Sequence, residues 1–404
     1  MDEVVCLGPS AARASYLDAE RVVQAALQTR CSALHPGWGF LAENPRFAAL
    51  CEQHGVTFVG PPSSAMETMG RKAPAKAAMR RAGVPVIPGS DGLLASADDA
   101  LASAERCGYP VILKADAGGG GRGMRKCFDA SQLRAAYSQA SAEAESAFGS
   151  GALYLEKYLE GGRHIEVQIL ADRFGACVHL GERECSVQRN HQKLIEESPS
   201  PVLDDAQRRE LGRIAVRAAS SIGYAGAGTV EFLRADSGEI YFMEMNTRLQ
   251  VEHGVSELVS GVDLVVKQLE VAAHRPLGLA QDSIRLQGSA IEVRVNAEDP
   301  ERDFKPSPGT LASFDFPREL GPGRIRVDTH ARAGDAVSPY YDSLLAKVIA
   351  HAPTRDEAIE TLLRCLRACR VEGVKTTIPL HLVVLDSAEF RSGRYDTRAI
   401  PGWS

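Results

Sequence analysis

Apolar runs and amphipathic stretches alternate along the first part of the chain, a pattern that is typical of α/β proteins. Helical periodicity predicts helices at residues 19–28, 64–82, 98–106 and 131–146. Short apolar runs predict strands at residues 4–7, 31–34, 56–59, 111–114 and 153–156. The remainder mixes strands and helices, so we expect a chain of α/β and α+β units.

Breaks rich in proline and glycine divide the chain into three expected domains. Residues 1–62 form the first and end at Gly60-Pro-Pro62. Residues 71–280 form the second, within which residues 86–158 have the size of a mobile lid. Residues 288–398 form the third, whose main helix is expected to begin at a capping box of Thr354 and Glu357.

Composition excludes several classes of protein. With 44% hydrophobic and 24% charged residues the chain is ordinary globular protein, and a net charge of −6 argues against a duplex nucleic-acid binder. No apolar run is long enough for a membrane helix, and the first residues have no signal-peptide pattern. Nine cysteines without a Cys-x-x-Cys pair favour a cytoplasmic protein. There are 10 lysines against 36 arginines, so a lysine in a special context is informative.

A glycine-rich loop follows the strand predicted at residues 111–114. It reads Lys114-Ala-Asp-Ala-Gly-Gly-Gly-Gly-Arg-Gly123, with neither the Walker spacing nor Gly-x-Gly-x-x-Gly. A loop without side chains lets backbone N–H groups surround a phosphate, and Lys114 can direct an ammonium at the same anion. The alternative is a flexible surface hairpin.

Two carboxylates and an amide mark a predicted hairpin. Residues 229–234 and 239–246 flank a four-residue turn, and pairing outward from it puts Glu231 opposite Phe242, with Glu244 as a diagonal neighbour. Glu231, Glu244 and Asn246 would then share a face with Ile240 and Phe242. Oxygen ligands of this kind suit Mg²⁺ or Mn²⁺. The alternative is an exposed acidic face, and a slip of one residue in the register would overturn the prediction.

The octapeptide that follows, residues 246–253, places Arg248, Gln250 and Glu252 at alternating positions. If it stays extended, these side chains share a face that could hold a small planar anion by an arginine fork and place a base beside it. Upstream, residues 182–193 are dense in polar groups, which by themselves are equally typical of a solvated loop.

In their order along the chain these motifs resemble biotin carboxylase, the ATP-grasp component of acetyl-CoA, propionyl-CoA and methylcrotonyl-CoA carboxylases. The resemblance runs from near residue 2 to about residue 398. Besides the glycine loop it rests on His35-Pro-Gly-Trp-Gly-Phe-Leu-Ala-Glu-Asn44, Glu156-Lys-Tyr-Leu159, His191-Gln-Lys193, the stretch Glu244 to His253, and Arg294-Val-Asn-Ala-Glu-Asp-Pro300. It implies an ATP-grasp fold with an incomplete N-terminal pre-ATP-grasp (Rossmann-like) domain and a C-terminal biotin carboxylase domain.

The resemblance also implies a reaction and the residues that carry it. ATP phosphorylates bicarbonate to carboxyphosphate, which carboxylates biotin on a carrier protein. The implied ATP-binding residues are Lys72, Lys114, Gly119, Gly120, Gly121, Glu156, Lys157, Leu159, His164, Gln188 and His191. Glu231, Glu244 and Asn246 match metal ligands for two Mg²⁺ or Mn²⁺ ions. The implied bicarbonate site is Lys193, Arg248, Gln250, Val251 and Glu252. Glu252 matches the base, Arg294 the residue that stabilises the biotin enolate, and Lys193 and Arg248 hold bicarbonate and carboxyphosphate.

Two departures from the family pattern stand out. The family begins with a βαβ segment that carries an Arg-Gly-Glu-Ile-Ala motif, and this chain starts at what looks like the next strand, so roughly thirty or more residues are expected to be missing. An incomplete first sheet argues against the usual family homodimer. The second departure is smaller and consists of the Asp116-Ala117 pair before the glycines and of Gly254 where proline is frequent, neither of which removes a functional group.

Three functions remain as hypotheses at this point. The first is biotin carboxylation, with the biotin carboxyl carrier protein and the carboxyltransferase on other chains and with no nucleic-acid or membrane partner. The second is another ATP-grasp ligase, of the carboxylate–amine or carbamoyl-phosphate type, which would not need Arg248, Glu252 and Arg294 together. The third is a truncated, inactive homologue that only binds partners.

Overall fold

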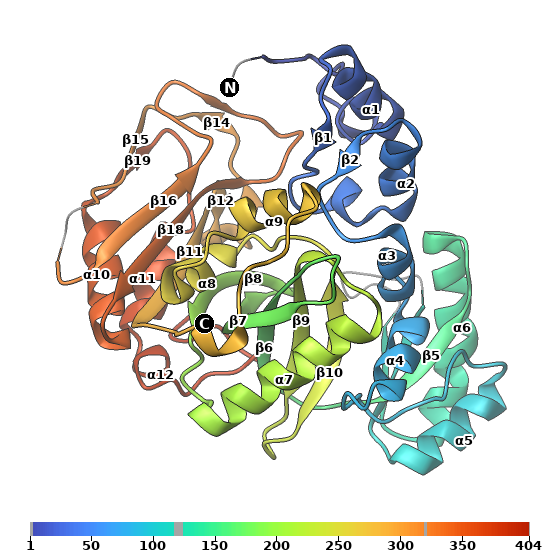
Figure 1. The fold of residues 1–404 in the computed structure, drawn as a ribbon. Helices are drawn as coiled ribbons and strands as arrows, with labels where there is room; N and C mark the ends of the chain where they lie inside the picture. The colour runs from blue at the N-terminus through green and yellow to red at the C-terminus, as the bar shows by residue number, and fades with distance from the viewer. Residues whose placement is uncertain (1–2, 117–123, 319–320, 404) are drawn as a thin grey trace.

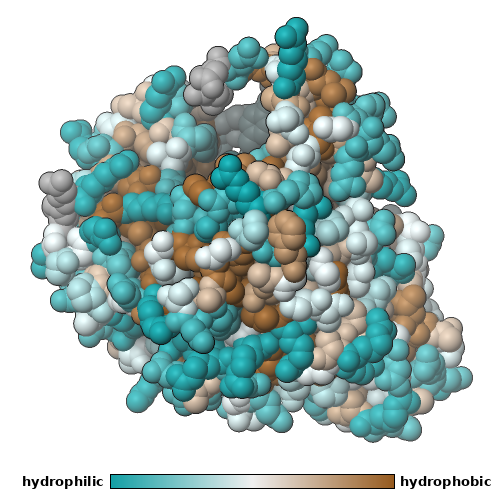
Figure 2. Space-filling model, in the orientation of Figure 1, coloured by the Kyte–Doolittle hydropathy of each residue, from teal (hydrophilic) through white to brown (hydrophobic). Residues whose placement is uncertain are grey.

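The computed structural model describes residues 3–116, 124–318 and 321–403. Figure 1 shows the N-terminal helices at one corner, a small unit with α5 and α6 beside them, and the rest of the chain built around a large sheet. In the described part of the chain, no helix has both the length and the apolar character that a membrane span needs. The face seen in Figure 2 is mostly hydrophilic, with apolar patches over the region where α8 and β16 lie in Figure 1.

The N-terminal unit is built from three helices around two short parallel strands. Its elements are α1 (Ala19–Gln28), β1 (Ala33–Leu34), α2 (Pro45–Gln53), β2 (Thr57–Phe58) and α3 (Ser63–Met69). Their apolar faces meet around Val23, Phe47 and Phe58, which are buried. The strand predicted at residues 4–7 is wrong: this segment pairs with no described strand, and Val4 is 83% exposed.

The smaller unit has a core of its own. Antiparallel strands lie in the order β4–β3–β5 and are covered by α5 and α6. The single helix predicted at 64–82 is two helices that break at Gly70-Arg71, because α4 starts anew at Lys72. The elements from there are α4 (Lys72–Arg81), α5 (Ala97–Cys107), β3 (Val111–Ala115), β4 (Arg125–Cys127), α6 (Ala130–Phe148) and β5 (Leu153–Lys157).

An eight-stranded sheet is the frame of the molecule, in the order β10–β9–β6–β7–β8–β11–β18–β16. Its strands are β6 (Arg163–Ala171), β7 (Cys177–Arg189), β8 (Gln192–Ser198), β9 (Gly226–Arg234), β10 (Ile240–Asn246), β11 (Ser289–Asn296), β16 (Arg324–Thr329) and β18 (Leu344–Ala352). Strand β8 pairs with β11, so the sheet runs unbroken from the second expected domain into the third.

Helices cover both faces of this sheet. On one face α7 and α10 pack on apolar residues of alternating positions, such as Ile165, Phe232 and Val293. The opposite face carries polar side chains and is partly covered by α8. The helices are α7 (Asp205–Ser221), α8 (His253–Ser260), α9 (Leu264–Ala272), α10 (Arg355–Ala368), α11 (Ile378–Asp386) and α12 (Ala388–Arg391). The predicted capping box of Thr354 and Glu357 begins α10.

Short strands complete the C-terminal part. They are β12 (Glu298–Asp299), β13 (Lys305–Pro306), β14 (Gly309–Thr310), β15 (Ser313–Asp315), β17 (Ala336–Val337) and β19 (Arg370–Glu372), and they form three separate two-stranded antiparallel pairs.

The hairpin of β9 and β10 contains a β-bulge that the sequence interpretation missed. Phe242 pairs with Phe232 and Glu244 with Glu231, so Met243 is skipped in the register. The predicted pairing of Glu231 with Phe242 is therefore wrong. An extra residue reverses the alternation of side chains, so Phe242 faces the core beneath α7 while Glu244 faces the polar side of the sheet with Glu231.

The C-terminal segment is fastened to this frame by a buried polar network. Arg355 donates to both oxygens of Glu197, at 2.6 and 3.0 Å, and the Tyr395 hydroxyl donates to the same carboxylate. Arg163 donates to the carbonyl of Tyr395 and lies over its ring. Because Arg163 precedes His164 on β6, this network holds the end of the strand that leads into the polar face.

We expect Tyr395→Phe to lower the free energy of unfolding by about 1–2 kcal/mol, because Glu197 loses one buried donor while the Arg355 pair remains. Urea unfolding measures the difference. Tyr340→Phe, at an exposed tyrosine, is the control and should leave the midpoint unchanged. A Tyr395 variant as stable as the wild type would contradict the fastening role.

Candidate functional site

Lys193 is the centre of a buried charge cluster on the polar face of the sheet. Its ammonium lies 2.5 Å from Glu166 Oε2, 3.0 Å from Glu231 Oε1 and 2.7 Å from Glu252 Oε1. Burial would lower the pKa of Lys193, but the three carboxylates outweigh it and hold that pKa well above its ordinary value. Lys193 is therefore a permanent cation among three buried acids.

Glu252 stands between two cations. One carboxylate oxygen contacts Lys193, and the other accepts from Arg294 Nη2 at 2.9 Å. The side chain is fully buried, which would raise its pKa, yet Lys193, Arg294 and Arg183 hold that pKa well below the ordinary value. Glu252 is thus held as an ionised carboxylate between Lys193 and Arg294.

Arg294 on β11 is oriented by a second carboxylate. Its Nε donates to Glu196 Oε1 at 2.7 Å, and burial raises the pKa of Glu196 to about 7. The backbone carbonyl of Arg294 accepts from Thr377 Oγ1 at 2.7 Å and lies 2.7 Å from His381 Nε2. Both the side chain and the backbone of this residue are consequently held in place.

The sequence prediction required an extended segment between β10 and α8, but in the structure this segment is not extended. It bends at Arg248 and turns at Val251, and Glu252 is the N-cap position of α8. The polar side chains still meet: Arg248 donates to Gln250 Oε1 and Asn246 Oδ1, both at 3.2 Å. The turn brings Glu252 down to Lys193, which a straight strand would not do.

Neighbouring contacts tie this segment to other parts of the chain. Arg248 Nε lies 3.0 Å from Glu43 Oε2, from the His35–Asn44 motif of the N-terminal unit. The Val251 carbonyl accepts from Lys347 Nζ at 2.6 Å. The predicted bicarbonate residues therefore lie where three parts of the chain converge.

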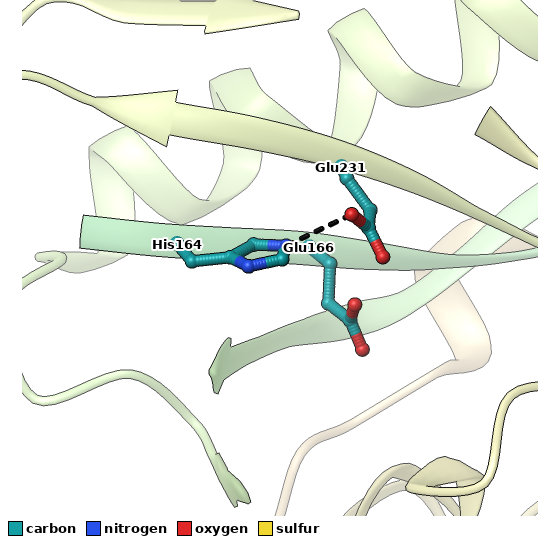
Figure 3. Close-up of side chains that lie close together, drawn as sticks. All are labelled: His164, Glu166 and Glu231. Carbon is teal, nitrogen blue, oxygen red and sulfur yellow. Dashed lines mark ion pairs between the residues drawn. The ribbon is translucent and has the colours of Figure 1, made fainter. Parts of the chain in front are cut away.

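A second group of polar side chains surrounds Glu231, which also contacts Lys193. Glu231 accepts from Asn246 Nδ2 at 2.8 Å and from Gln250 Nε2 at 3.1 Å, and its second oxygen lies 3.0 Å from His164 Nε2. Figure 3 shows His164 and Glu166 on one strand and Glu231 on the next, with the ring and the carboxylates close together. His164, Glu166 and Glu231 could by distance hold a cation.

The position of Lys193 decides where a divalent cation fits. Its ammonium already lies between Glu166 and Glu231, so a metal bound by Glu231 would have to lie on the side toward Glu244 and Asn246. Glu244 pairs with Glu231 in the sheet, and its side chain is 45% exposed. Two carboxylates and an amide oxygen are donor types that suit Mg²⁺ and Mn²⁺. A bound ion would have to displace Arg248 from Asn246 Oδ1 and Lys72 from Glu244 Oε2.

The predicted nucleotide residues divide between this cluster and the small unit. Glu156 lies 2.5 Å from Lys114 Nζ and 2.8 Å from Lys76 Nζ. Burial would raise its pKa, but the two lysines lower that pKa to about 2. Lys72 donates to Glu244 Oε2 at 3.2 Å, which links the two groups.

Other predicted nucleotide residues lie at the end of β5 and around the turn between β7 and β8. Lys157 donates to the carbonyls of Gly108 and Tyr109 at 3.2 and 2.6 Å, and Leu159 follows β5 in a half-buried position. Gln188 pairs with Lys193 across β7 and β8, and His191 is exposed in the turn between these strands. Gly119, Gly120 and Gly121 lie outside the described residues.

Several residues of the cluster were missed by the sequence interpretation. Arg183, fully buried, donates to Glu166 Oε1 at 2.5 Å and to Gln168 Oε1 at 2.6 Å. Glu196 and Lys76 were missed as well. A signal was present for β6, where His164, Glu166 and Gln168 alternate with aliphatic residues, the pattern of a strand with one buried polar face.

Family models match nearly the whole chain. The biotin carboxylase N-terminal domain matches residues 1–66, the carbamoyl-phosphate synthase L chain ATP-binding domain residues 71–280, and the biotin carboxylase C-terminal domain residues 292–401.

Among curated proteins, biotin carboxylase of Nostoc sp. is 48% identical over 396 residues, covering 98% of this chain and 88% of the relative. The 2-oxoglutarate carboxylase small subunit of Hydrogenobacter thermophilus is 49% identical over 384 residues, 95% of this chain and 81% of the relative.

Solved structures are equally close. The biotin carboxylase domain dimer of H. thermophilus 2-oxoglutarate carboxylase, in complex with MgADP, ADP and bicarbonate, superimposes with a TM-score of 0.91 at 48% identity, covering 98% of this chain and 86% of that one. A biotin carboxylase–beta-gamma-ATP complex from Campylobacter jejuni gives 0.92 at 46% identity, covering 98% and 88%. The expected ATP-grasp fold is confirmed, and the chain belongs to the biotin carboxylase family of ATP-grasp ligases.

Proposed function

We propose that this chain uses ATP and bicarbonate to carboxylate biotin on a carrier protein, through carboxyphosphate, as the first half-reaction of an acyl-CoA carboxylase. The observation that carries the proposal is Glu252 held between Lys193 and Arg294. An ionised carboxylate between two cations is suited to take a proton from one small anion and to hold another.

The proton step follows from the charges around Glu252. Bicarbonate is a weak nucleophile until it loses its proton. Gln250 donates to Glu231, which also contacts Lys193, and Arg248 donates to Gln250, so these two side chains would bind the anion near Lys193. When the bound anion interacts with Lys193 and Arg294, these two cations stabilise the Glu252 carboxylate less, and the pKa of Glu252 rises. Glu252 thereby becomes a stronger base at the moment that bicarbonate arrives, and Arg294 is then positioned to stabilise the biotin enolate.

The phosphoryl end of the reaction would lie toward the nucleotide residues. Glu231, Glu244 and Asn246 would hold Mg²⁺ or Mn²⁺, with two ions expected, and bound metal supplies positive charge that neutralises ATP phosphates. Lys72 and Lys114 add ammonium groups on the same side. We assign ATP binding to them together with Gly119, Gly120, Gly121, Glu156, Lys157, Leu159, His164, Gln188 and His191.

Glu244→Gln is expected to raise the Mg²⁺ concentration needed for half-maximal ADP release about tenfold, because one charged oxygen ligand is lost. A magnesium titration of the initial rate measures it. Glu239→Gln on the same hairpin is an exposed control and should follow the wild-type curve. An unchanged magnesium dependence of the Glu244 variant would remove Glu244 from the metal site.

The other substrates and partners follow from the same proposal. Two relatives are named as parts of larger enzymes, one of pyruvate carboxylase in Methanothermobacter thermautotrophicus and the other of 2-oxoglutarate carboxylase in H. thermophilus. We propose that the biotin carboxyl carrier protein and the carboxyltransferase that act with this chain are separate chains. The carboxyltransferase would then select the final acceptor, and the complex would act in the cytoplasm.

The deciding experiment measures ADP release with free biotin, bicarbonate and Mg²⁺. We expect release that requires bicarbonate and rises with biotin. Release stimulated by ammonia but not by biotin would instead indicate a carbamoyl-phosphate-type ligase. No nucleotide binding in a calorimetric titration with Mg-ATP would indicate an inactive homologue.

A further inference from the structure

An aspartate of the small unit caps a helix that begins outside it. Helix α4 has Arg71 at its N-cap position, and that side chain makes no capping hydrogen bond. Instead Asp116, which directly follows β3, accepts the N–H of Ala73 through Oδ1 at 2.9 Å. Its other oxygen accepts from Arg71 Nε and Nη2 at 3.0 and 2.8 Å.

The exposure of the two partners indicates that the hydrogen bond from Asp116 to the start of α4 contributes more to stability than its ion pair with Arg71. The Asp116 side chain is 1% exposed, whereas that of Arg71 is 59% exposed. A pair with an exposed arginine contributes little because water screens it. A carboxylate that accepts an N–H in the first turn of a helix also interacts favourably with the helix dipole.

The two elements joined by this cap each carry lysines directed at the candidate site. Lys114 lies two residues before Asp116 on β3 and contacts Glu156. Helix α4 carries Lys72, which contacts Glu244, and one turn later Lys76, which contacts Glu156. Side chains four apart lie on one face of a helix. Any shift of α4 against β3 therefore moves Lys72 relative to Lys114.

We propose that Asp116 is a positioning residue that caps α4 from the neighbouring strand and thereby fixes Lys72 relative to Lys114. The role of these two lysines in binding ATP phosphates rests on the proposed function; the cap does not. Asp116 also belongs to the pair at which this sequence departs from the family pattern that the resemblance implies.

Two measurements test the proposal on the full chain with Asp116→Ala and Asp116→Asn. Hydrogen exchange of the ligand-free protein should show the first-turn amides of α4 exchanging about fivefold faster in the alanine variant, the size of a typical cap. Its Michaelis constant for ATP should rise about fivefold while kcat stays within about twofold, because both lysines act on bound ground-state phosphate. Asparagine, a good cap, should restore most of both effects.

Controls separate the cap from ion pairing. Arg71→Gln keeps the cap and should stay within about twofold of wild type in both readouts. Asp91→Asn removes an exposed pair with Arg80 at the other end of α4 and should change neither. Wild-type exchange and Michaelis constant in the alanine variant, or an asparagine variant as impaired as alanine, would overturn the proposal. If the wild-type chain releases no ADP, the exchange experiment still decides the cap, because it needs no ligand.

Discussion

The Glu252→Gln variant is expected to release ADP in the presence of bicarbonate and biotin at least ~100-fold more slowly than the wild-type chain. Glutamine has the size of glutamate but does not take up the bicarbonate proton. The variant should fold, because Lys193 keeps Glu166 and Glu231, and Arg294 keeps Glu196. Steady-state ADP release gives the rate, and a calorimetric titration should give nearly normal nucleotide binding.

The control for this substitution is Glu210→Gln, which removes an exposed carboxylate on α7 that pairs with Arg213. It should behave as the wild type in both assays. Bicarbonate-dependent ADP release close to the wild-type rate in the Glu252 variant would rule out Glu252 as the base. Loss of nucleotide binding along with the rate would show instead that the substitution disturbs the site as a whole.

The Lys193→Met variant is expected to lose about 3–5 kcal/mol of unfolding free energy at neutral pH, because three buried carboxylates lose their shared cation. The pH dependence of its stability should also change, beyond what Glu166 and Glu196 contribute, whose pKa values burial already raises in the wild type. In the wild type the pKa values of Glu231 and Glu252 are well below the ordinary value, so their contribution to stability is present above the unfolded pKa and is lost as pH falls through the folded one.

Without Lys193, burial and mutual repulsion should raise the carboxylate pKa values of the folded state above those of the unfolded state. The folded variant then holds protons that the unfolded chain releases, so it should be most stable in mild acid and lose stability as pH rises from about 5 to 8. Thermal unfolding across this range measures the slope. Lys267→Met, at a half-buried pair with the single carboxylate of Glu270, is the control, and a Lys193 variant with the wild-type slope would contradict the shared-cation role.

The sequence predicted elements well where local signals agree. Helix α1 has the predicted bounds, and Thr354 begins α10 because its capping box is local. The strand at residues 4–7 fails because an apolar run becomes a strand only when another strand pairs with it. The domain boundaries and the roles of the site residues stay predictions.

The candidate site was only partly predictable, since its residues are brought together by strand order. Lys193 meets Glu166 because β6, β7 and β8 are neighbours, and Arg294 meets Glu196 because β8 pairs with β11. Glu252 reaches Arg294 from the N-cap of α8. No spacing in the sequence specifies that order. The resemblance supplied Lys193, Glu252 and Arg294, whereas Glu166 and Arg183 emerge only from the contacts they make in the folded chain.

The bulge at Met243 changes the spacing between the residues of β10 that face the core. Ile240 and Phe242 both face the core and are two positions apart. Met245, the next residue of β10 that faces the core, comes three positions after Phe242. Met243 itself is 38% exposed, so its identity matters little to the core. The bulge allows Phe242 and Met245 to face the same side although they are three positions apart, where a regular strand would need an even separation. If Met243 were paired in the register it would oppose Glu231, and Glu244 would turn toward the core. The bulge, rather than the side chain at position 243, therefore keeps Glu244 beside Glu231, and β10 should tolerate many substitutions at position 243.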